Sequence, residues 1–184
     1  HEPNDNADRV SQDQFGNKWF GAFNNLGSGA RVLDDNGTLE ATDDQWFALT
    51  NLPSDCVSCM TLDRDGIMWV GTAAGVRYYY ATQTPQALIG YNLVIPVSQN
   101  IRSIAVDPQN NKWFGTAEGI SVLAADDYTW LASYTSLEGT HPSPLPGNVV
   151  NAIAFDPHTG AAYLGTDKGL ARLTTPYKAT GANV

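Results

Sequence analysis

The chain has little positive charge, few histidines and only two cysteines. Its 184 residues contain 10 Lys and Arg against 19 Asp and Glu, which gives a formal net charge of −9. No run of basic residues occurs in it. Nucleic acids and anionic lipid surfaces attract proteins through clustered positive charge, so neither is an expected partner. A neutral or cationic ligand is expected instead, and neutral sugars are a natural candidate.

Long apolar runs are also missing. No stretch approaches the roughly 20 apolar residues that span a bilayer, so we expect no membrane insertion of this segment. The chain begins with HEPNDN, without Met and without an apolar signal core, and we interpret it as a processed or truncated product. Any signal peptide or membrane anchor is then expected to lie outside this sequence.

The two cysteines, Cys56 and Cys59, lie close together in the segment DCVSCM. A redox pair at this spacing normally caps a helix, and a zinc site needs two further ligands. In an extended segment, residues three apart face opposite sides, which opposes a bridge between them. Two buried structural thiols are the preferred interpretation. A local disulfide in a turn and a functional pair are the alternatives.

One pattern is present four times along the chain. An aspartate is followed six or seven residues later by an aromatic residue and then by a glycine, and successive aromatic residues are 50, 44 and 50 residues apart. A period in this range, with strand-like content and no helical stretch, is typical of a β-propeller blade. The four pairs are Asp13 and Trp19, Asp63 and Trp69, Asp107 and Trp113, and Asp156 and Tyr163.

Each repeat is interpreted as a series of antiparallel strands. An apolar run ends in the aspartate, a tight turn rich in Asp, Pro, Asn and Gly follows, and the second strand carries the aromatic residue. A glycine-containing loop leads to a third strand, and a more polar fourth strand closes three of the repeats, including the segment 86–92. We expect the aspartate to cap the turn and the aromatic residue to pack between blades. The repeated residues are therefore interpreted as structural.

The sequence predicts one all-β domain, a β-propeller of about four four-stranded antiparallel blades. The tail after Tyr163 has no obvious fourth strand, so the last blade is expected to lack its outer strand. The blades either form an open arc of a larger ring or close a small ring. An arc would be stabilised by the remainder of a parent protein or by self-association, because it exposes two blade faces. The predicted domain spans residues 1–184, with blades at approximately 7–50, 51–94, 95–135 and 145–184.

Three segments resemble the two-component regulator propeller repeat. The segment LPSDCVSCMTLDRDGIMWVGTAAGV (52–76) is similar to a full copy, and 145–170 and 100–120 are similar to it at most positions. The first repeat keeps the central DQFGNKWFG (13–21) but has an expanded loop after it. Streptogramin-lyase-like propellers share part of this pattern.

This resemblance implies a bacterial β-propeller of the kind found in extracytoplasmic sensor regions of hybrid histidine kinases, which bind glycan fragments. Other proteins with this repeat are secreted or lie at the cell surface, and some are tied to protein export. The resemblance therefore implies a periplasmic, secreted or cell-surface location. It does not identify the ligand.

No catalytic constellation is recognisable, so we predict no catalytic residues, no metal site and no cofactor. His158 lies in the turn DPHTG and is expected to be exposed. His141 lies in a long insertion before the last repeat and is weighed as a ligand contact. Asp63 and Asp65 are spaced as in calcium loops, but the later oxygen ligands are missing, so a solvated turn is preferred.

The candidate ligand site is a set of amides and charges in loops at one end of the blades. These loops enter the first strand of a blade or join its second and third strands, and their side chains suit sugar hydroxyl groups. Tyr78, Tyr79 and Tyr80 are weighed for stacking on a sugar, with strand packing as the preferred interpretation. The candidates are Asn24, Asn25, Asp55, Asn100, Arg102, Glu118, Asn148, Asp167 and Lys168.

The predicted function is non-catalytic binding of a ligand or partner by a propeller segment of a secreted or periplasmic protein, in carbohydrate-related sensing or recognition. One alternative is a scaffold or self-association module, which predicts a stable multimer in solution. The other is part of a propeller enzyme, a lyase or a glycan-degrading enzyme, which predicts an acid, a base and an orienting group at one rim.

Overall fold

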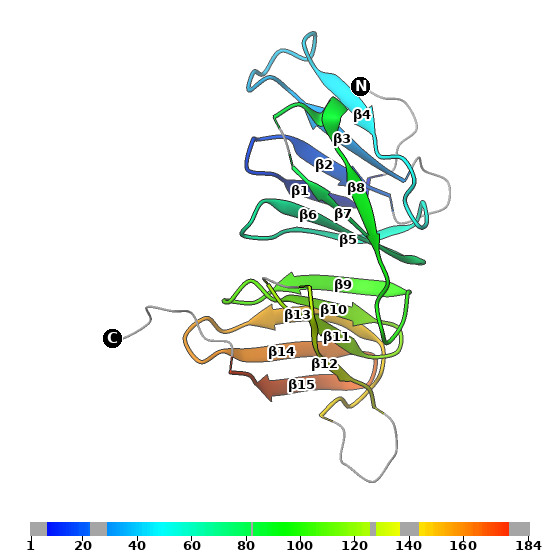
Figure 1. Cartoon of the computed structure of the whole chain (residues 1–184), viewed down its shortest axis with the longest axis vertical. Coiled ribbons are helices and arrows are strands. Elements are labelled where there is room, and N and C mark those ends of the chain that lie inside the picture. Colours follow the sequence, from blue (N-terminus) through cyan, green and yellow to red (C-terminus); the bar gives the residue numbers. More distant parts are fainter. Residues whose placement is uncertain (1–6, 23–28, 82, 126–127, 137–143, 177–184) are drawn as a thin grey trace. The chain divides into compact units, whose positions relative to one another are not determined.

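The computed structural model consists of antiparallel sheets joined by turns, apart from one short 3-10 turn (Figure 1). The chain forms two compact units, His1–Val94 (unit 1) and Ile95–Val184 (unit 2), and each contains two sheets. The described residues are 7–22, 29–81, 83–125, 128–136 and 144–176.

Unit 1 contains sheets A and B, and in both the strands follow one another in chain order. Sheet A consists of β1 (Arg9–Gln12), β2 (Lys18–Gly21), β3 (Ala30–Asp34) and β4 (Gln45–Ala48). Sheet B consists of β5 (Val57–Leu62), β6 (Ile67–Thr72), β7 (Gly75–Tyr80) and β8 (Gly90–Leu93), with the 3-10 turn η1 (Pro85–Ala87) before β8.

Unit 2 contains sheets C and D. Sheet C consists of β9 (Ile101–Val106), β10 (Lys112–Thr116), β11 (Ile120–Leu123) and β12 (Trp130–Tyr134). Sheet D consists of β13 (Val150–Phe155), β14 (Ala161–Thr166) and β15 (Gly169–Thr174). Four antiparallel sheets, the last of which has three strands among the described residues, confirm the predicted all-β class and the predicted short last blade.

The expected strand over 86–92 differs from the structure in its first half. Residues Pro85–Ala87 form η1, and strand pairing starts only at Gly90. Proline fixes φ near −65° and has no N–H to give to a ladder, which favours the first position of a short helical turn. Pro85 is buried, so this turn also contributes to the packing between the sheets of unit 1.

Trp19 is buried in the core between sheets A and B. It shares a cluster with Val57 and Val70 of sheet B, and its ring centroid lies 5.7 Å from that of Tyr79. Strand β5 contacts both β1 and β2, so the two sheets approach each other most closely at their first strands. A large aromatic side chain at this position buries more apolar area than any other residue type could.

Unit 2 repeats this arrangement with different residues. Trp113 of sheet C shares a cluster with Val150 and Leu164 of sheet D, and its ring centroid lies 5.3 Å from that of Phe155. Strand β13 contacts β9 and β10. The hydroxyl of Ser103 in β9 donates to the carbonyl oxygen of Val150 at 3.1 Å, which fixes the start of β13 against β9.

A glycine two residues after each of these tryptophans makes the close approach possible. A Cβ atom on Gly21 would lie 2.7 Å from Val57 Cγ1, and one on Gly115 would lie 2.8 Å from the carbonyl oxygen of Val150. In sheet D the equivalent Gly165 has more space, because the nearest atom to its added Cβ would be Ala152 Cβ at 3.5 Å. Glycine at this position therefore serves contact with the following sheet.

Tyr163 takes the tryptophan position in sheet D but is not enclosed like Trp19 or Trp113. It is 37% exposed, and Leu170 on the paired strand is 74% exposed. Both lie on the face of sheet D that points away from sheet C, since the opposite face carries the residues that pack around Trp113. The expectation that every repeated aromatic packs between blades therefore fails at Tyr163, because no sheet of unit 2 covers this face among the described residues.

The glycine contacts predict that the same substitution at two positions of unit 2 changes the free energy of unfolding by unequal amounts. Gly115→Ala places a methyl group against Ser103 and Val150 and is expected to lower the free energy of unfolding by about 2 kcal/mol. Gly165→Ala meets only Ala152 and is expected to change it by no more than about 0.5 kcal/mol. Urea unfolding of both variants measures the difference, and equal losses would contradict this account of the glycines.

Candidate functional site

The repeated aspartate holds both the turn and the tryptophan. In sheet B, Asp63 Oδ1 accepts the backbone N–H groups of Asp65 at 3.0 Å and Ile67 at 2.8 Å. Its other oxygen, Oδ2, accepts the indole N–H of Trp69 at 2.9 Å. A carboxylate that accepts three N–H groups satisfies donors that would be costly to bury without a partner.

The same bonds recur in one sheet of each unit with an added side chain. Trp19 donates its indole N–H to Asp13 Oδ2 at 2.9 Å, and the Asn17 side chain donates to the same oxygen at 2.9 Å. Trp113 donates to Asp107 Oδ2 at 3.1 Å. The sequence suggested the turn cap but not the indole bond. The signal for it was the constant spacing of six residues together with tryptophan, since phenylalanine has no N–H to donate.

Asp156 has a different set of partners. Its spacing to Tyr163 is seven residues, and its carboxylate accepts the backbone N–H of His158 at 2.8 Å and the hydroxyl of Thr159 at 2.7 Å. The Thr159 hydroxyl, followed by the His158 backbone N–H, lowers the pKa of Asp156 below its ordinary value. These hydrogen bonds are exposed, so they replace hydrogen bonds to water and contribute little to the stability of the fold.

A matched pair of variants in unit 2 tests how much the hydrogen bond to the indole contributes to the free energy of unfolding. Asp107→Ala leaves the indole N–H of Trp113 and backbone N–H groups buried without an acceptor, so we expect the free energy of unfolding to fall by about 3 kcal/mol. Asp156→Ala removes only exposed bonds and is expected to cost less than about 1 kcal/mol. Chemical denaturation measures both variants. A similar loss of unfolding free energy in both would contradict the claim that the buried bond contributes more than the exposed ones.

Short hairpins display some of the predicted ligand residues. Thr116 donates its hydroxyl to the carbonyl oxygen of Gly119 at 2.9 Å and accepts the backbone N–H of Glu118 at 3.1 Å. Thr166 makes the same bonds to Gly169 and to Lys168. The glycines have φ near +137°, which favours glycine because residues with a Cβ rarely adopt it. Residues at the tips of these hairpins are thereby fixed at the end of each sheet.

The loops at this end of unit 2 are held together by backbone bonds. The Ala117 N–H donates to the carbonyl oxygen of Asn100 at 2.9 Å, and the Asp167 N–H donates to that of Val149 at 3.0 Å. The bond from Ser103 to Val150 keeps the starts of β9 and β13 side by side, so both loop pairs lie at the same end. The loops and the start of β9 at this end of unit 2 carry Asn100, Arg102, Glu118, Asn148, Asp167 and Lys168.

Arg102 lies on a β-bulge that the sequence did not reveal. Ser103 pairs with Gly115 and Ile101 with Thr116, which leaves Arg102 without a partner residue in the ladder. Ser58 and Asn151 occupy the same irregularity in β5 and β13. A bulge re-aims a side chain and often lies beside a functional site. Nothing in the residue types at these three positions indicates it, because they are Ser, Arg and Asn.

The remaining candidates are not part of this group. Asp55 is exposed in the loop before β5 of unit 1. Asn24, Asn25 and His141 lie outside the described residues. Tyr78 stacks on Trp69, with ring centroids 4.8 Å apart, so it packs within its sheet.

Cys56 and Cys59 are half-buried and form no disulfide, so the structure contains neither the local disulfide nor the fully buried pair. Cys59 faces the Ser58 hydroxyl, with 3.7 Å between sulfur and oxygen. Cys56 lies in the loop before β5, where its backbone N–H donates to the Ser54 hydroxyl at 3.1 Å and its carbonyl oxygen accepts the N–H of Ala73 at 3.0 Å.

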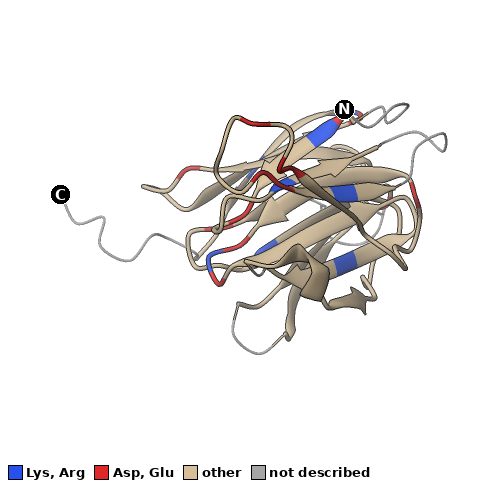
Figure 2. Cartoon of the chain, turned by 90° about the horizontal axis from the view of Figure 1, so that it is seen from above, with Lys and Arg blue, Asp and Glu red and all other residues tan. Residues whose placement is uncertain are grey.

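Charge is distributed unevenly between strands and loops. Figure 2 shows Asp and Glu mainly in loops and turns, and Lys and Arg mainly on strands. Among the described residues, no group of three or more His, Cys, Asp or Glu is arranged to hold a metal ion. The described part of the chain has no helix long and apolar enough for a membrane span.

Comparisons with known proteins agree with this architecture. Residues 51–74 match the family described as two component regulator propeller. A search of curated proteins gives no significant match.

Among solved structures, one similar protein is PorZ, a bacterial surface component of the type-IX secretion system of Porphyromonas gingivalis. The two share 22% identity with a TM-score of 0.76, over 94% of this chain and 26% of PorZ. Another is the extracellular domain of a putative hybrid two component system of B. thetaiotaomicron, with 22% identity and a TM-score of 0.68, over 92% of this chain and 22% of that protein.

A third similar structure is the virginiamycin B lyase of Staphylococcus aureus, with 18% identity and a TM-score of 0.53 over 94% of this chain and 57% of the lyase. The chain therefore spans about a quarter of the length of the first two proteins. At these identities the likeness shows the fold, which confirms the predicted β-propeller. Residues 51–74 carry a two component regulator propeller repeat, and the chain that surrounds them has the β-propeller fold.

Proposed function

We propose that this chain is part of a non-catalytic, ligand-binding β-propeller of a bacterial periplasmic, secreted or cell-surface protein, and that its ligand is a neutral carbohydrate. The observation that carries this proposal is the polar end of unit 2, where hydrogen bonds hold loops of two neighbouring sheets that carry amide and charged side chains. Planar amides and charges held in this way suit the hydroxyl groups of a sugar, which both donate and accept hydrogen bonds.

The comparisons support the proposed setting by analogy. One similar structure is an extracellular domain of a putative hybrid two component system and another is a surface component, so a propeller of this shape occurs outside the cytoplasm. Because the chain spans about a quarter of each, we propose that it works as part of a larger protein. The acidic balance of the chain also favours a neutral ligand over an anionic polymer.

Binding is tested with neutral oligosaccharides of several linkage types, with a sulfated polysaccharide as the charged control. A true ligand stabilises the folded chain by about 2.7 kcal/mol at a hundredfold excess over its dissociation constant, which a thermal shift detects. We expect the double variant Glu118→Ala and Lys168→Ala to weaken binding about tenfold without lowering the melting temperature, because neither side chain holds the fold together.

His158→Ala is the matched control, since this residue lies at the other end of sheet D, in the turn between β13 and β14. Its affinity for the sugar should equal that of the unchanged chain. No stabilisation by any oligosaccharide, or equal affinities of the double variant and the unchanged chain, would overturn the proposal.

A further inference from the structure

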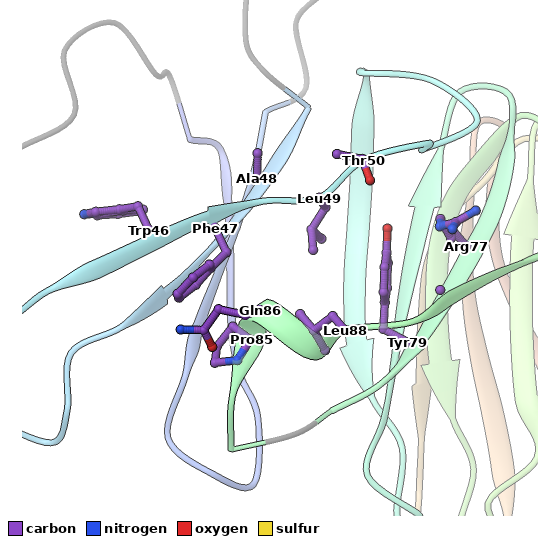
Figure 3. A pocket seen from close by; sticks show the side chains of 11 residues that line it. Trp46, Phe47, Ala48, Leu49, Thr50, Arg77, Tyr79, Pro85, Gln86 and Leu88 are labelled. Carbon is purple, nitrogen blue, oxygen red and sulfur yellow. The ribbon is translucent and has the colours of Figure 1, made fainter.

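A pocket of about 310 Å³ lies in unit 1 between the outer strands of sheets A and B (Figure 3). One side of it is formed by β4 and by Leu49 and Thr50, and the other by β7, η1, Leu88 and Gly90. The two sheets are in contact at their first strands, and η1 fills only part of the space between their outer strands. None of the predicted ligand-binding loop residues lines this pocket, but Tyr79, which is weighed from the sequence for stacking on a sugar, does.

Three apolar side chains line the pocket. Phe47 and Leu49 belong to the side that follows β4, and Leu88, which follows η1, lies next to Tyr79 in Figure 3. Leu49 is buried in the core of unit 1, and Phe47 and Leu88 pack partly against that core, so these side chains are held by their neighbours. A fixed apolar wall provides favourable burial for a ligand with an apolar body.

Arg77 and Tyr79 of β7 form a polar wall, and each has a polar atom that lacks a hydrogen-bond partner within the described ranges. Tyr79 is only 3% exposed, and its hydroxyl has no partner among the described residues. The Arg77 guanidinium lies over the Tyr79 ring, 5.6 Å from Cζ to the centroid, and Nη1 donates to Asn92 Oδ1 at 2.9 Å. Its buried Nε also has no partner in the described part of the chain. Buried polar groups are nearly always paired, so this wall favours a ligand that supplies an acceptor.

Gly90 keeps this polar pair in place. A Cβ atom at this position would contact Tyr79 Cε1 and lie 2.5 Å from Arg77 Nε. Because glycine has no Cβ, β8 closes directly over Arg77 and Tyr79 and holds the guanidinium against the ring. The two groups are thus ordered before any ligand arrives, which reduces the entropy lost on binding.

The polar wall offers donors. Burial raises the pKa of Tyr79, although the neighbouring Arg77 guanidinium acts in the opposite direction through both its charge and its N–H groups, so the phenol stays protonated at neutral pH. Arginine has donors only and is always charged. No carboxylate of the described residues forms an ion pair with Arg77. An anionic acceptor such as a carboxylate therefore complements both groups.

We propose that this pocket binds a small carboxylic acid with an apolar body, of the size of a single aromatic ring or a branched aliphatic chain. The carboxylate accepts hydrogen bonds from the Tyr79 hydroxyl and the Arg77 guanidinium, and the body lies against Phe47, Leu49 and Leu88. A pocket of about 310 Å³ is at the small end of ligand sites, which excludes long chains and oligosaccharides. This site is additional to the polar end of unit 2.

Phenylacetate and 3-methylbutanoate are the probes, and the full chain is titrated with each by calorimetry and by amide chemical shifts. Phenylacetamide, which has the same ring and no charge, is the matched ligand. We expect phenylacetate to bind with a dissociation constant of about 1 mM or tighter, and phenylacetamide about tenfold more weakly. The amide shifts should be largest at Leu49, Leu88 and Gly90.

Two variants separate the polar contacts from folding. Tyr79→Phe removes only the hydroxyl and should weaken phenylacetate binding about fivefold, and Arg77→Gln should weaken it about tenfold or more. Tyr79→Phe should also keep or raise the melting temperature without ligand, because a buried hydroxyl without a partner stabilises nothing. A lower melting temperature would mean that the hydroxyl already has a partner, which overturns the proposal.

Arg172→Gln is the control for loss of charge, since Arg172 also lies over a tyrosine ring, that of Tyr163 at 6.0 Å, but far along the chain in sheet D. Its affinity for phenylacetate should stay within about twofold of the unchanged chain. Absence of saturable binding of both acids, shifts confined to other residues, or equal weakening by Arg172→Gln and Arg77→Gln would each overturn the proposal. The oligosaccharide experiments are independent of these results.

Discussion

The hydrogen bond between a buried carboxylate and an indole N–H is the interaction on which sheets A, B and C depend. It joins the turn between the first two strands to the side chain that fills the space before the next sheet, as Asp13 does with Trp19 and Asp107 with Trp113. Without the carboxylate the indole N–H would be buried in apolar surroundings without a partner. One aspartate thus sets both the local geometry of a sheet and its fit to the neighbouring sheet.

The strand order and the short last sheet were predictable, because the spacing of the aspartate, the aromatic residue and the glycine repeats along the chain. The replacement of tryptophan by Tyr163 also coincided with a change of environment, since Asp156 has no indole to hold and makes exposed hydrogen bonds instead. The β-bulge at Arg102 was not predictable, because it depends on the register between β9 and β10 and not on residue type. The start of β8 was misplaced because Pro85 favours a turn within an otherwise strand-like segment.

The two candidate sites differ in how far the sequence reveals them. Loop residues such as Glu118 and Lys168 could be named in advance, since hairpin tips follow directly from the repeat. The pocket could not be predicted from the sequence. It exists because sheets A and B are in contact at their first strands but are separated at their outer strands. Its polar residues, Arg77 and Tyr79, lie in a strand whose sequence indicates only packing within the core. Their buried polar atoms, which lack a hydrogen-bond partner among the described residues, are visible only in the structure.

The valine at the start of one sheet fits the glycine of the sheet before it, as Val57 fits Gly21 and Val150 fits Gly115. In both units, the first sheet thus offers a glycine that the valine of the second sheet contacts. Duplication of the gene segment that encodes one such sheet can extend the array without a new interface, because the valine face and the glycine face are duplicated together. This self-complementarity explains how chains of very different length can be assembled from one unit while most other positions diverge.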